Sequence, residues 1–428
     1  MSDATVTDKG PAQGRAQGDG PRRSPWRVII DEMVEGSGWL VTLLSILLAL
    51  AVGAVLIIVS DPDVRATFGY FFSRPGDALS SSGEAVWTAY KALFTGAIWN
   101  PDRSWNAATA LGPISETLTE ATPLLLGGLA IGLAFKAGLF NIGGQGQLIA
   151  GAICANLVGF SLDGPPVVAM LAAVGAGIVG GAMYGSIVGV LKARTGAHEV
   201  IVTIMLNHIA VAFLAWLITT DAFQNPDRND AISKSVSDAA LLPRLLSWLP
   251  GGAGIRVHTG LILALLAVLF CWWLLNRSTL GFELRAVGAN ASAARTAGMS
   301  VGNSQIMAML ISGGLMGVVG ASQVLGTTNA SHALTPQIDA GLGFTAITVA
   351  LLGRASPVGT VFAALLFGAL QAGGRTMQAQ AGVSIEIVGV IQALIVLFVA
   401  APPLVRGLFR LRGGTSAQAA LASKGWNG

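Results

Sequence analysis

Charged residues are scarce in this chain of 428 residues. Aspartate, glutamate, lysine and arginine together make up 11% of it, whereas a typical soluble protein contains about 25%. The charges are also unevenly spread. Residues 39–59 (WLVTLLSILLALAVGAVLIIV) contain none, and a helix of that length spans a hydrocarbon core about 30 Å thick. Because similar uncharged runs recur along the chain, the sequence predicts a polytopic membrane protein.

Cysteine is almost absent as well. Cys154 and Cys271 both lie in apolar segments, so we expect neither a disulfide framework nor a metal site. The sequence also lacks the H-E-x-x-H motif of metalloproteases, which argues against an intramembrane metalloenzyme. A net charge of +3 gives no reason to expect nucleic acid as a partner.

Apolar segments predict the fold class, an all-α polytopic membrane protein with about ten transmembrane or re-entrant helices. Two of the segments, 143–160 and 341–353, are short or interrupted by glycine, and boundaries can move by several residues. The first segment is longer than the apolar region of a cleaved signal peptide and has no A-x-A site behind it. The ten segments are 39–59, 118–136, 143–160, 166–191, 199–219, 259–275, 303–325, 341–353, 357–374 and 385–404.

The distribution of lysine and arginine predicts the orientation, because short cytoplasmic loops carry an excess of both. One side receives almost all the basic residues of the short loops and tails, and the opposite short loops hold only Arg375. We therefore expect both termini in the cytoplasm. The basic residues on that side are Arg22, Arg23, Arg27, Lys192, Arg194, Arg277, Arg285, Arg295, Arg354, Arg406, Arg410 and Arg412.

This orientation gives a domain plan. We expect a disordered cytoplasmic tail at 1–38, a membrane domain at 39–405 and a cytoplasmic tail at 406–428. Within the membrane domain, 60–115 and 220–258 are long external loops and 276–300 is a cytoplasmic loop. Part of the first external loop (AVWTAYKALFTGAIW) is typical of an amphipathic helix at the membrane interface.

Two segments with the same order of elements weakly predict a two-fold pseudo-repeat. Segment 127–160 consists of an apolar helix, a polar break and a second apolar helix, and segment 341–374 has the same order with its break at 351–359 (LLGRASPVG). Paired interruptions in the two halves of a transporter point to its substrate route.

The first break reads NIGGQGQ and raises the clearest question about function. Backbone amides that leave a helix inside a membrane need partners from the protein or from water in a cavity. One interpretation is that Gln145 and Gln147 only satisfy helix ends at a turn. The other is that the break lines a translocation pathway, through Asn141, Gly143, Gly144, Gln145 and Gln147.

Polar residues inside two later segments are further pathway candidates. Asn207 and His208 lie two turns into the segment that begins at 199. Gln323 lies near the end of segment 303–325, and Asn329 lies just beyond it. Intramembrane polar groups tend to face a bundle interior or a cavity. The carboxylates Glu120, Glu199 and Glu386 are expected near segment ends, which argues against an ion-coupled secondary transporter.

Four blocks in order resemble the permease subunits of ribose-type ABC importers, in the branch associated with nucleosides and basic membrane lipoproteins. The likeness extends over roughly 116–404. The blocks are ATPLLLGGLAIGLAFKAGLFNIGGQGQLIAGA (121–152), HEVIVTIMLNHIA (198–210), LGFELRAVGANASAARTAGM (280–299) and GFTAITVALLGRASPVGTVFAALLFGAL (343–370).

The resemblance implies a bacterial inner-membrane importer in which this chain forms the translocation pathway. It implies three protein partners: a separate ATPase subunit that holds ATP and Mg²⁺, a second similar permease that makes a heterodimer, and an external substrate-binding protein. The chain has no Gly-Lys dipeptide and therefore no Walker A loop for nucleotide phosphates. We expect no cofactor bound by this chain.

The third block would be the segment that contacts the ATPase. Asn290 is suited to cap a short helix from Ala291 to about Ala297, with Gly298 ending it. A short capped helix of this kind fits a groove in a partner, although an ordinary solvated loop remains the alternative. The expected coupling residues are Glu283, Arg285, Asn290, Ala293, Ala294, Arg295 and Gly298.

The sequence leaves the transported solute open. A pathway lined by amides and small residues suits a neutral polar solute such as a nucleoside, but it suits a simple sugar equally well. Branched-chain amino-acid permeases share the broader architecture, and an ion-coupled transporter is the less favoured alternative.

Overall fold

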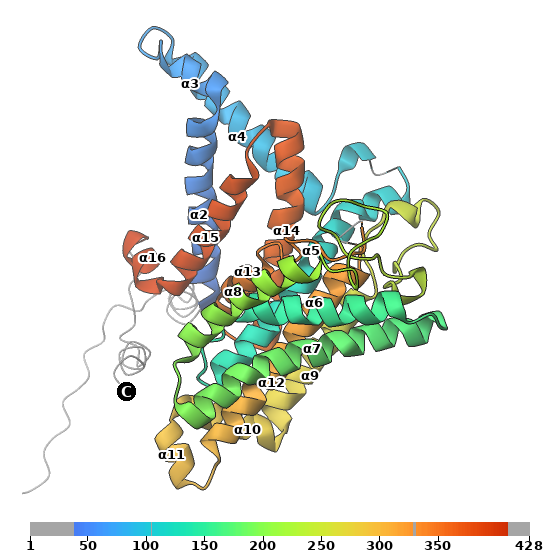
Figure 1. Cartoon of the computed structure of the whole chain (residues 1–428). Coiled ribbons are helices and arrows are strands. Elements are labelled where there is room, and N and C mark those ends of the chain that lie inside the picture. The colour runs from blue at the N-terminus through green and yellow to red at the C-terminus, as the bar shows by residue number, and fades with distance from the viewer. Residues whose placement is uncertain (1–37, 104, 328–330, 410–428) are drawn as a thin grey trace, which may run out of the picture. The chain divides into compact units, whose positions relative to one another are not determined.

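The computed structural model describes residues 38–103, 105–327 and 331–409. The predicted tails at 1–38 and 406–428 therefore fall almost wholly outside the described residues, as does Asn329. In the described part of the chain the regular structure is helical, with two isolated β-bridges. The α-helices are α2 (Gly38–Ser60), α3 (Pro62–Phe68), α4 (Pro75–Ala97), α5 (Ala107–Lys136), α6 (Gly144–Ser161), α7 (Pro166–Thr195), α8 (Glu199–Leu217), α9 (Gly260–Arg277), α10 (Thr279–Ala289), α11 (Ala291–Thr296), α12 (Val301–Leu325), α13 (Leu342–Leu352), α14 (Pro357–Ala381), α15 (Ile385–Ala400) and α16 (Pro402–Leu408) (Figure 1).

Each predicted apolar segment corresponds to a helix, and the all-α class is confirmed. Among the described residues seven helices are long and apolar enough to cross a membrane, or eight if α15 and α16 together form one span. The prediction of about ten is therefore too high by this measure. The excess comes from α6, in which two glutamines and several glycines dilute the apolar residues, and from α13, which has only 11 residues.

The start of α5 differs most from the prediction. The helix begins at Ala107 rather than near 118, because Asn106 forms a capping box: its Oδ1 accepts a hydrogen bond from Thr109 N at 2.8 Å. The polar run from 115 to 120 (SETLTE), which the sequence placed at the edge of a segment, therefore lies inside a 30-residue helix. Glu120 is near the middle of this helix, so its predicted position at a segment end is wrong.

The predicted external loop at 60–115 is also largely helical. Its aromatic stretch lies in α4, as the expected amphipathic helix, but α4 packs along α14. The contact is close enough to require glycine, because a Cβ at Gly373 of α14 would lie 2.3 Å from the carbonyl oxygen of Leu93.

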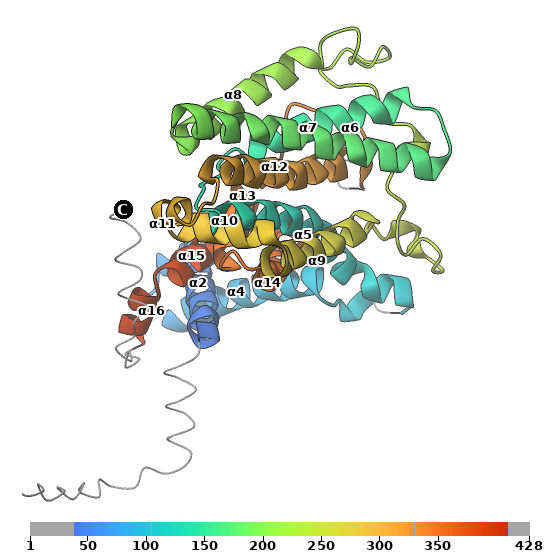
Figure 2. The ribbon, with the colours of Figure 1, turned by 90° about the horizontal axis from the view of Figure 1, so that it is seen from below.

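Within residues 46–400 the helices pack side by side in a fixed order (Figure 2). Helix α8 contacts α6, α6 and α7 contact α12, α12 contacts α5, and α5 contacts both α13 and α14. The two central helices, α5 and α12, are each about 89% buried over their apolar windows. A helix that is apolar on all sides belongs in such an interior position.

Glycines set the spacing of α6, α7 and α12. A Cβ at Gly181 of α7 would lie 2.2 Å from the carbonyl oxygen of Gly313, and one at Gly317 of α12 would lie 2.1 Å from that of Gly177. Membrane helices gain van der Waals contact and not hydrophobic transfer energy when they associate, so small residues at the interface let the backbones approach.

The predicted external loop at 220–258 is ordered and packs on helix ends. Ser233 N donates to Leu334 O at 3.1 Å, Ser237 N to Gly159 O at 3.0 Å, and Leu242 N to Leu325 O at 2.8 Å. These backbone hydrogen bonds tie the loop to the C-terminal ends of α6 and α12 and to the segment that precedes α13.

Both predicted helix-break-helix segments are present. The first break runs from α5 to α6 and the second, between α13 and α14, contains Arg354 and Ala355 with φ of 52° and 49°. Ser356 then caps α14 by accepting a hydrogen bond from Gly359 N. The two segments share this order, while the two-fold pseudo-repeat stays a prediction.

Candidate functional site

The break after α5 is held by a buried cluster of amides. Asn141 Nδ2 donates to Gln147 Oε1 at 3.0 Å and to Ser312 Oγ at 2.9 Å, while Asn141 Oδ1 accepts from Gly143 N at 3.0 Å. Ser312 Oγ in turn donates to the carbonyl oxygen of Ala130 at 2.7 Å. The three side chains are between 0% and 1% exposed, so this cluster joins α5, α6 and α12 at a point where the backbone has left its helix.

Asn207 of α8 stabilises the same break from the other side through two hydrogen bonds. Its Oδ1 accepts a hydrogen bond from Gly146 N at 2.8 Å, and its Nδ2 donates to the carbonyl oxygen of Ile142 at 2.9 Å. One amide thus satisfies two backbone groups on either side of the start of α6, as a break inside a membrane requires. His208, the next residue, is exposed whereas Asn207 is buried, so these two predicted pathway residues do not share the same surroundings.

The break also extends well into the bundle. Asn207 lies eight residues beyond Glu199, which corresponds to about 12 Å along α8. Glu199 itself is held at the start of α8 by an ion pair with Lys192 Nζ at 2.7 Å. At the other end of the break, Gly138 has φ of +72° and a Cβ there would lie 3.0 Å from Gly288 Cα of α10. The chain therefore reaches α10, turns back along the first two turns of α8 and only then starts α6.

The N-terminus of α13 meets the N-terminus of α6. A Cβ at Gly343 would lie 2.6 Å from Gln145 N, and Gln145 Nε2 donates to Asp339 Oδ2 at 3.0 Å. With 11 residues, α13 is about 16 Å long, roughly half of a hydrocarbon core. It is therefore a half-length helix that begins deep in the bundle. Transporters place substrate sites where the N-termini of broken helices meet.

The structure thus divides the predicted pathway residues by their surroundings. Asn141, Gln147 and Asn207 are buried and fully engaged in supporting the break. Gly143 and Gly144 are buried beside Thr203 and Met316. Gln145 is half-buried where the N-termini of α6 and α13 meet.

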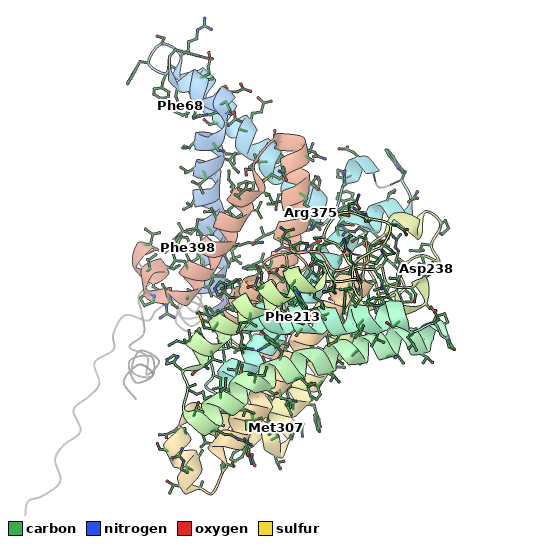
Figure 3. The ribbon with its side chains drawn as sticks, in the orientation of Figure 1. Phe68, Phe213, Asp238, Met307, Arg375 and Phe398 are labelled. Carbon is green, nitrogen blue, oxygen red and sulfur yellow. The ribbon has the colours of Figure 1, made fainter. Side chains whose placement is uncertain are left out.

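Gln323 lies beside a polar cavity of about 300 Å³ next to the start of α13. Its wall is formed by four helices, α5, α12, α14 and α15, and by Ala340 and Leu342 on either side of Gly341. Its polar lining residues are Glu120, Gln323, Gln371, Arg375 and Gln392. Figure 3 labels Arg375 on α14, and Arg375 Nη2 lies 2.8 Å from Glu120 Oε1.

Glu120 is the functional candidate that sequence reasoning missed. Its side chain is 7% exposed and Arg375 is its partner. An ionisable residue near the middle of a spanning helix is a functional-site candidate by default. The predicted segment began only at 118, which placed Glu120 near its end. The helical pattern that continues back through Pro113 was the signal that could have placed it in the interior.

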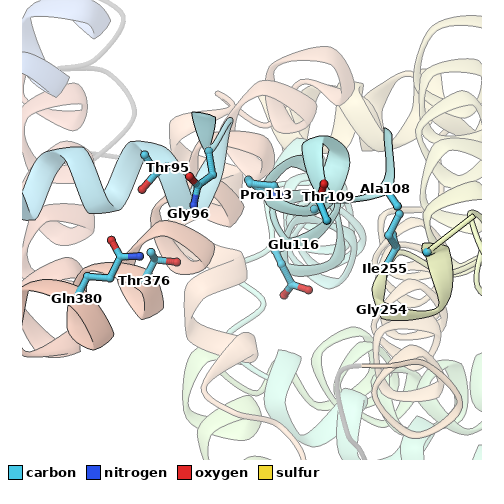
Figure 4. A pocket seen from close by; sticks show the side chains of 13 residues that line it. Thr95, Gly96, Ala108, Thr109, Pro113, Glu116, Gly254, Ile255, Thr376 and Gln380 are labelled. Atoms are coloured by element: carbon cyan, nitrogen blue, oxygen red, sulfur yellow. The ribbon is translucent and has the colours of Figure 1, made fainter. Parts of the chain in front are cut away.

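A second cavity, of about 340 Å³, lies between α4, α5, α14 and the loop before α9 (Figure 4). Glu116, one turn before Glu120 on α5, points into it, and Glu116 Oε2 lies 2.8 Å from Arg256 Nη1. Arg256 also donates to the carbonyl oxygen of Thr327 at 3.2 Å. These bonds fix the loop against the first half of α5.

Comparison with known proteins identifies the family. The model of a family described as the permease component of branched-chain amino acid transport systems matches residues 114–400. The chain belongs to this family.

Individual relatives show the same likeness over most of the permease. The guanosine ABC transporter permease protein NupP of Bacillus subtilis is 38% identical over 86% of this chain and 94% of its own length. The glucose ABC transporter permease protein TsgB13 of Haloferax volcanii is 37% identical (67% and 75%), and the nucleoside ABC transporter permease protein NupB of Lactococcus lactis is 37% identical (67% and 79%). NupQ, a second guanosine permease protein of Bacillus subtilis, is 26% identical (60% and 80%). No solved structure matches.

These findings confirm the predicted resemblance and make the chain a multi-pass ABC transporter permease subunit, which is a transport component and not an enzyme. They exclude the alternative of an ion-coupled secondary transporter.

The cytoplasmic-loop segment that was predicted to contact the ATPase contains the predicted capped helix. Asn290 Oδ1 accepts a hydrogen bond from Ala293 N at 3.0 Å and caps α11, and Gly298 has φ of +84° just beyond its end. Ala294 is buried against Val287 of α10 and Val301 of α12, whereas Ala293 faces outward. Arg285 and Arg295 are exposed, Glu283 is half-buried, and exposed Phe282, which the sequence did not single out, lies beside them.

His258, in the loop before α9, makes the stability of the permease depend on pH. Burial lowers the pKa of His258 to about 4, and the nearby Arg256 adds to the effect. The unfolded chain takes up a proton below about 6.5 and the folded chain does not, so acidification from pH 6.5 to pH 4 should lower the free energy of unfolding by about 3 kcal/mol. Thermal unfolding of the purified permease at a series of pH values measures this.

A variant isolates that contribution. His258 Nδ1 accepts a hydrogen bond from Gly260 N at 3.1 Å, and His258→Asn keeps an acceptor without a titrating group. We expect a smaller loss of Tm between pH 6.5 and 4 in the variant. An equal loss in both proteins would assign the pH dependence to other groups.

Proposed function

We propose that this chain is the permease subunit of an ABC importer for nucleosides. The observation that carries the proposal is the similarity to NupP over 86% of the chain, supported by NupB. The polar cavity beside α13 fits a neutral solute, because its one carboxylate and its one guanidinium neutralise each other. TsgB13, a glucose permease protein with 37% identity, makes a simple sugar the second candidate.

Uptake by the assembled importer tests the cargo. The chain is expressed with the permease, ATPase and binding-protein genes that accompany it, in cells lacking their own nucleoside uptake. We expect ATP-dependent accumulation of labelled guanosine that excess adenosine reduces and excess glucose does not. Accumulation of glucose without guanosine would replace the nucleoside assignment with the sugar one.

Three protein partners complete the proposed importer. ATP and Mg²⁺ bind to a separate ATPase, a binding protein delivers the solute from outside, and a second permease completes a heterodimer. The match of both NupP and NupQ, two permease proteins of one Bacillus strain, supports the heterodimer. Gentle affinity purification from the native membrane should recover an ATPase and a second permease, and recovery of an active transporter made of this chain alone would contradict the assembly.

We further propose the orientation and the roles of the predicted residues. Both termini lie in the cytoplasm of a bacterial cell, the loops at 60–115 and 220–258 are external, and 276–300 is cytoplasmic. The halves that contain the two helix breaks are related as a pseudo-repeat. Asn141, Gln147, Asn207 and the adjacent glycines shape the break, while Gln145 and Gln323 face the solute route and exposed His208 lies off it.

The proposed coupling surface gives a test on α11. Ala293→Asp places a charge on the outer face of a helix whose cap and buried Ala294 stay intact. We expect ATP hydrolysis by the complex to continue while solute uptake falls about tenfold or more, since the ATPase then no longer grips α11. The measurement is the ratio of solute transported to ATP hydrolysed in proteoliposomes.

Two further variants serve as controls for this result. Ala66→Asp makes the same change on an exposed residue of α3 and should leave the ratio unchanged. Ala294→Asp buries a charge between α10 and α12 and should reduce the yield of folded protein. Unchanged coupling in Ala293→Asp would place the ATPase contact elsewhere.

A further inference from the structure

We propose that the cavity lined by Glu120, Gln323, Gln371, Arg375 and Gln392 is a transit site that binds the hydroxyl groups of the solute's sugar ring. The proposal rests on the function proposed above and adds a binding site inside the permease. It identifies the recognised chemistry as a neutral ring with adjacent hydroxyls, which a nucleoside and a simple sugar share.

Two polar groups of the cavity lack a hydrogen-bond partner. Glu120 Oε1 lies within ion-pair distance of Arg375, but no hydrogen bond of acceptable geometry reaches this oxygen, and Gln392 Nε2 has no acceptor. Counted over the whole residue, Glu120 is 5% exposed. Buried polar atoms are almost always satisfied in folded proteins, so an acceptor and a donor whose hydrogen-bonding capacity the protein itself does not use are available to a ligand in this cavity.

The position of Glu120 strengthens this reading. It lies thirteen residues after the first residue of α5 (107 to 120), or about 20 Å along a 30-residue helix. Placing a carboxylate there is costly, and a buried ion pair adds little stability over apolar residues of the same shape. None of the contacts that support the helix break uses Glu120 or Arg375. A role in binding accounts for a pair that packing does not require.

The remaining walls fit a polar, uncharged ring. Gln323, Gln371 and Gln392 add amides that can both donate and accept, while Pro123, Leu342 and Val388 supply an apolar surface. The Glu120 carboxylate can accept a hydrogen bond from one hydroxyl while the adjacent Arg375 guanidinium donates to the neighbouring hydroxyl. The volume of about 300 Å³ is at the lower end of the range for small-molecule sites.

The cavity also lies where the solute route is expected. Ala340, with φ of 44°, and Leu342 line it on either side of the N-terminus of α13. That terminus meets the N-terminus of α6. A solute in the cavity therefore contacts the start of α13, which itself packs against the start of α6.

The test compares Glu120→Gln with wild type on two solutes. Both complexes contain the same binding protein, so the ratio of wild-type to variant uptake cancels its selectivity. We expect Glu120→Gln to lower the maximal uptake of guanosine about tenfold, the usual effect of losing a hydrogen bond to a charged group, and to lower that of 2′,3′-dideoxyguanosine less than twofold. Glu386→Gln, the same change on an exposed residue of α15, should alter neither.

A second variant distinguishes a loss of solute binding from a folding defect. Gln392→Leu removes a donor that has no partner, so its Tm should equal or exceed that of wild type while guanosine uptake falls severalfold. Equal losses on both solutes, or unchanged guanosine uptake in both variants, would overturn the transit site. If the wild-type importer takes up a hexose and no nucleoside, the nucleoside function fails, and the same variants on that hexose and its deoxy derivatives decide the site.

Discussion

Gly181→Ala should destabilise the permease severely, by about 3 kcal/mol. The added Cβ would lie 2.2 Å from the carbonyl oxygen of Gly313 and 2.6 Å from Gly317 Cα. These neighbours are backbone atoms of α12, so no side-chain rotation can relieve the clash, and α7 and α12 must separate along their whole contact. Thermal unfolding in detergent and the yield of monodisperse protein measure the effect.

Gly175→Ala on the same helix is the matched control. An added Cβ there meets no atom within 4 Å, and alanine favours a helix over glycine by up to about 1 kcal/mol. We expect an unchanged or slightly raised Tm. If both variants behaved alike, helix propensity and not the close approach of the backbones would explain the glycines of α7.

Asn141→Ala should have the second large effect, a loss of about 4 kcal/mol. The substitution leaves Gly143 N without an acceptor and both ends of the Gln147 amide without a partner. Each buried polar group left unsatisfied costs about 1–3 kcal/mol. Asn303→Ala, on an exposed residue of α12, should change the free energy of unfolding by less than about 0.5 kcal/mol.

A double-mutant cycle separates the amide cluster from general packing. If Asn141 and Gln147 act as one unit, the double variant should cost much less than the sum of the two single variants. Additive losses would show that the two amides stabilise the break independently.

The cluster shows how far the NIGGQGQ stretch could be read from the sequence. Three amides and three glycines between apolar helices predicted a break with satisfied backbone groups, and the structure has one. The sequence could not show which amides hold the break together and which face the solute route. That division depends on Ser312 and Asn207, which lie 171 and 66 positions from Asn141 (312 − 141 and 207 − 141) and approach it only in the folded bundle.

The cap of α11 is the opposite case. Asn290, the short helix and Gly298 were predicted from local rules, and the structure has all three, because capping involves residues only three positions apart. Ala294 was predicted as a contact for a partner and is buried instead. Its neighbours Val287 and Val301 belong to the helices before and after it, and local spacing does not specify that contact.

The sequence by itself determined the membrane class, the helical fold and the two helix breaks, because length, low charge and local polarity are sufficient for each. The family followed from the resemblance of four ordered sequence blocks to known permeases. Tertiary structure alone decided that Glu120 is interior, that α13 begins against the start of α6 and that a polar cavity lies beside its start. These features depend on which helix ends meet. Contacts between distant segments decide that, through backbone approaches that only glycine permits and hydrogen bonds to partners far along the chain.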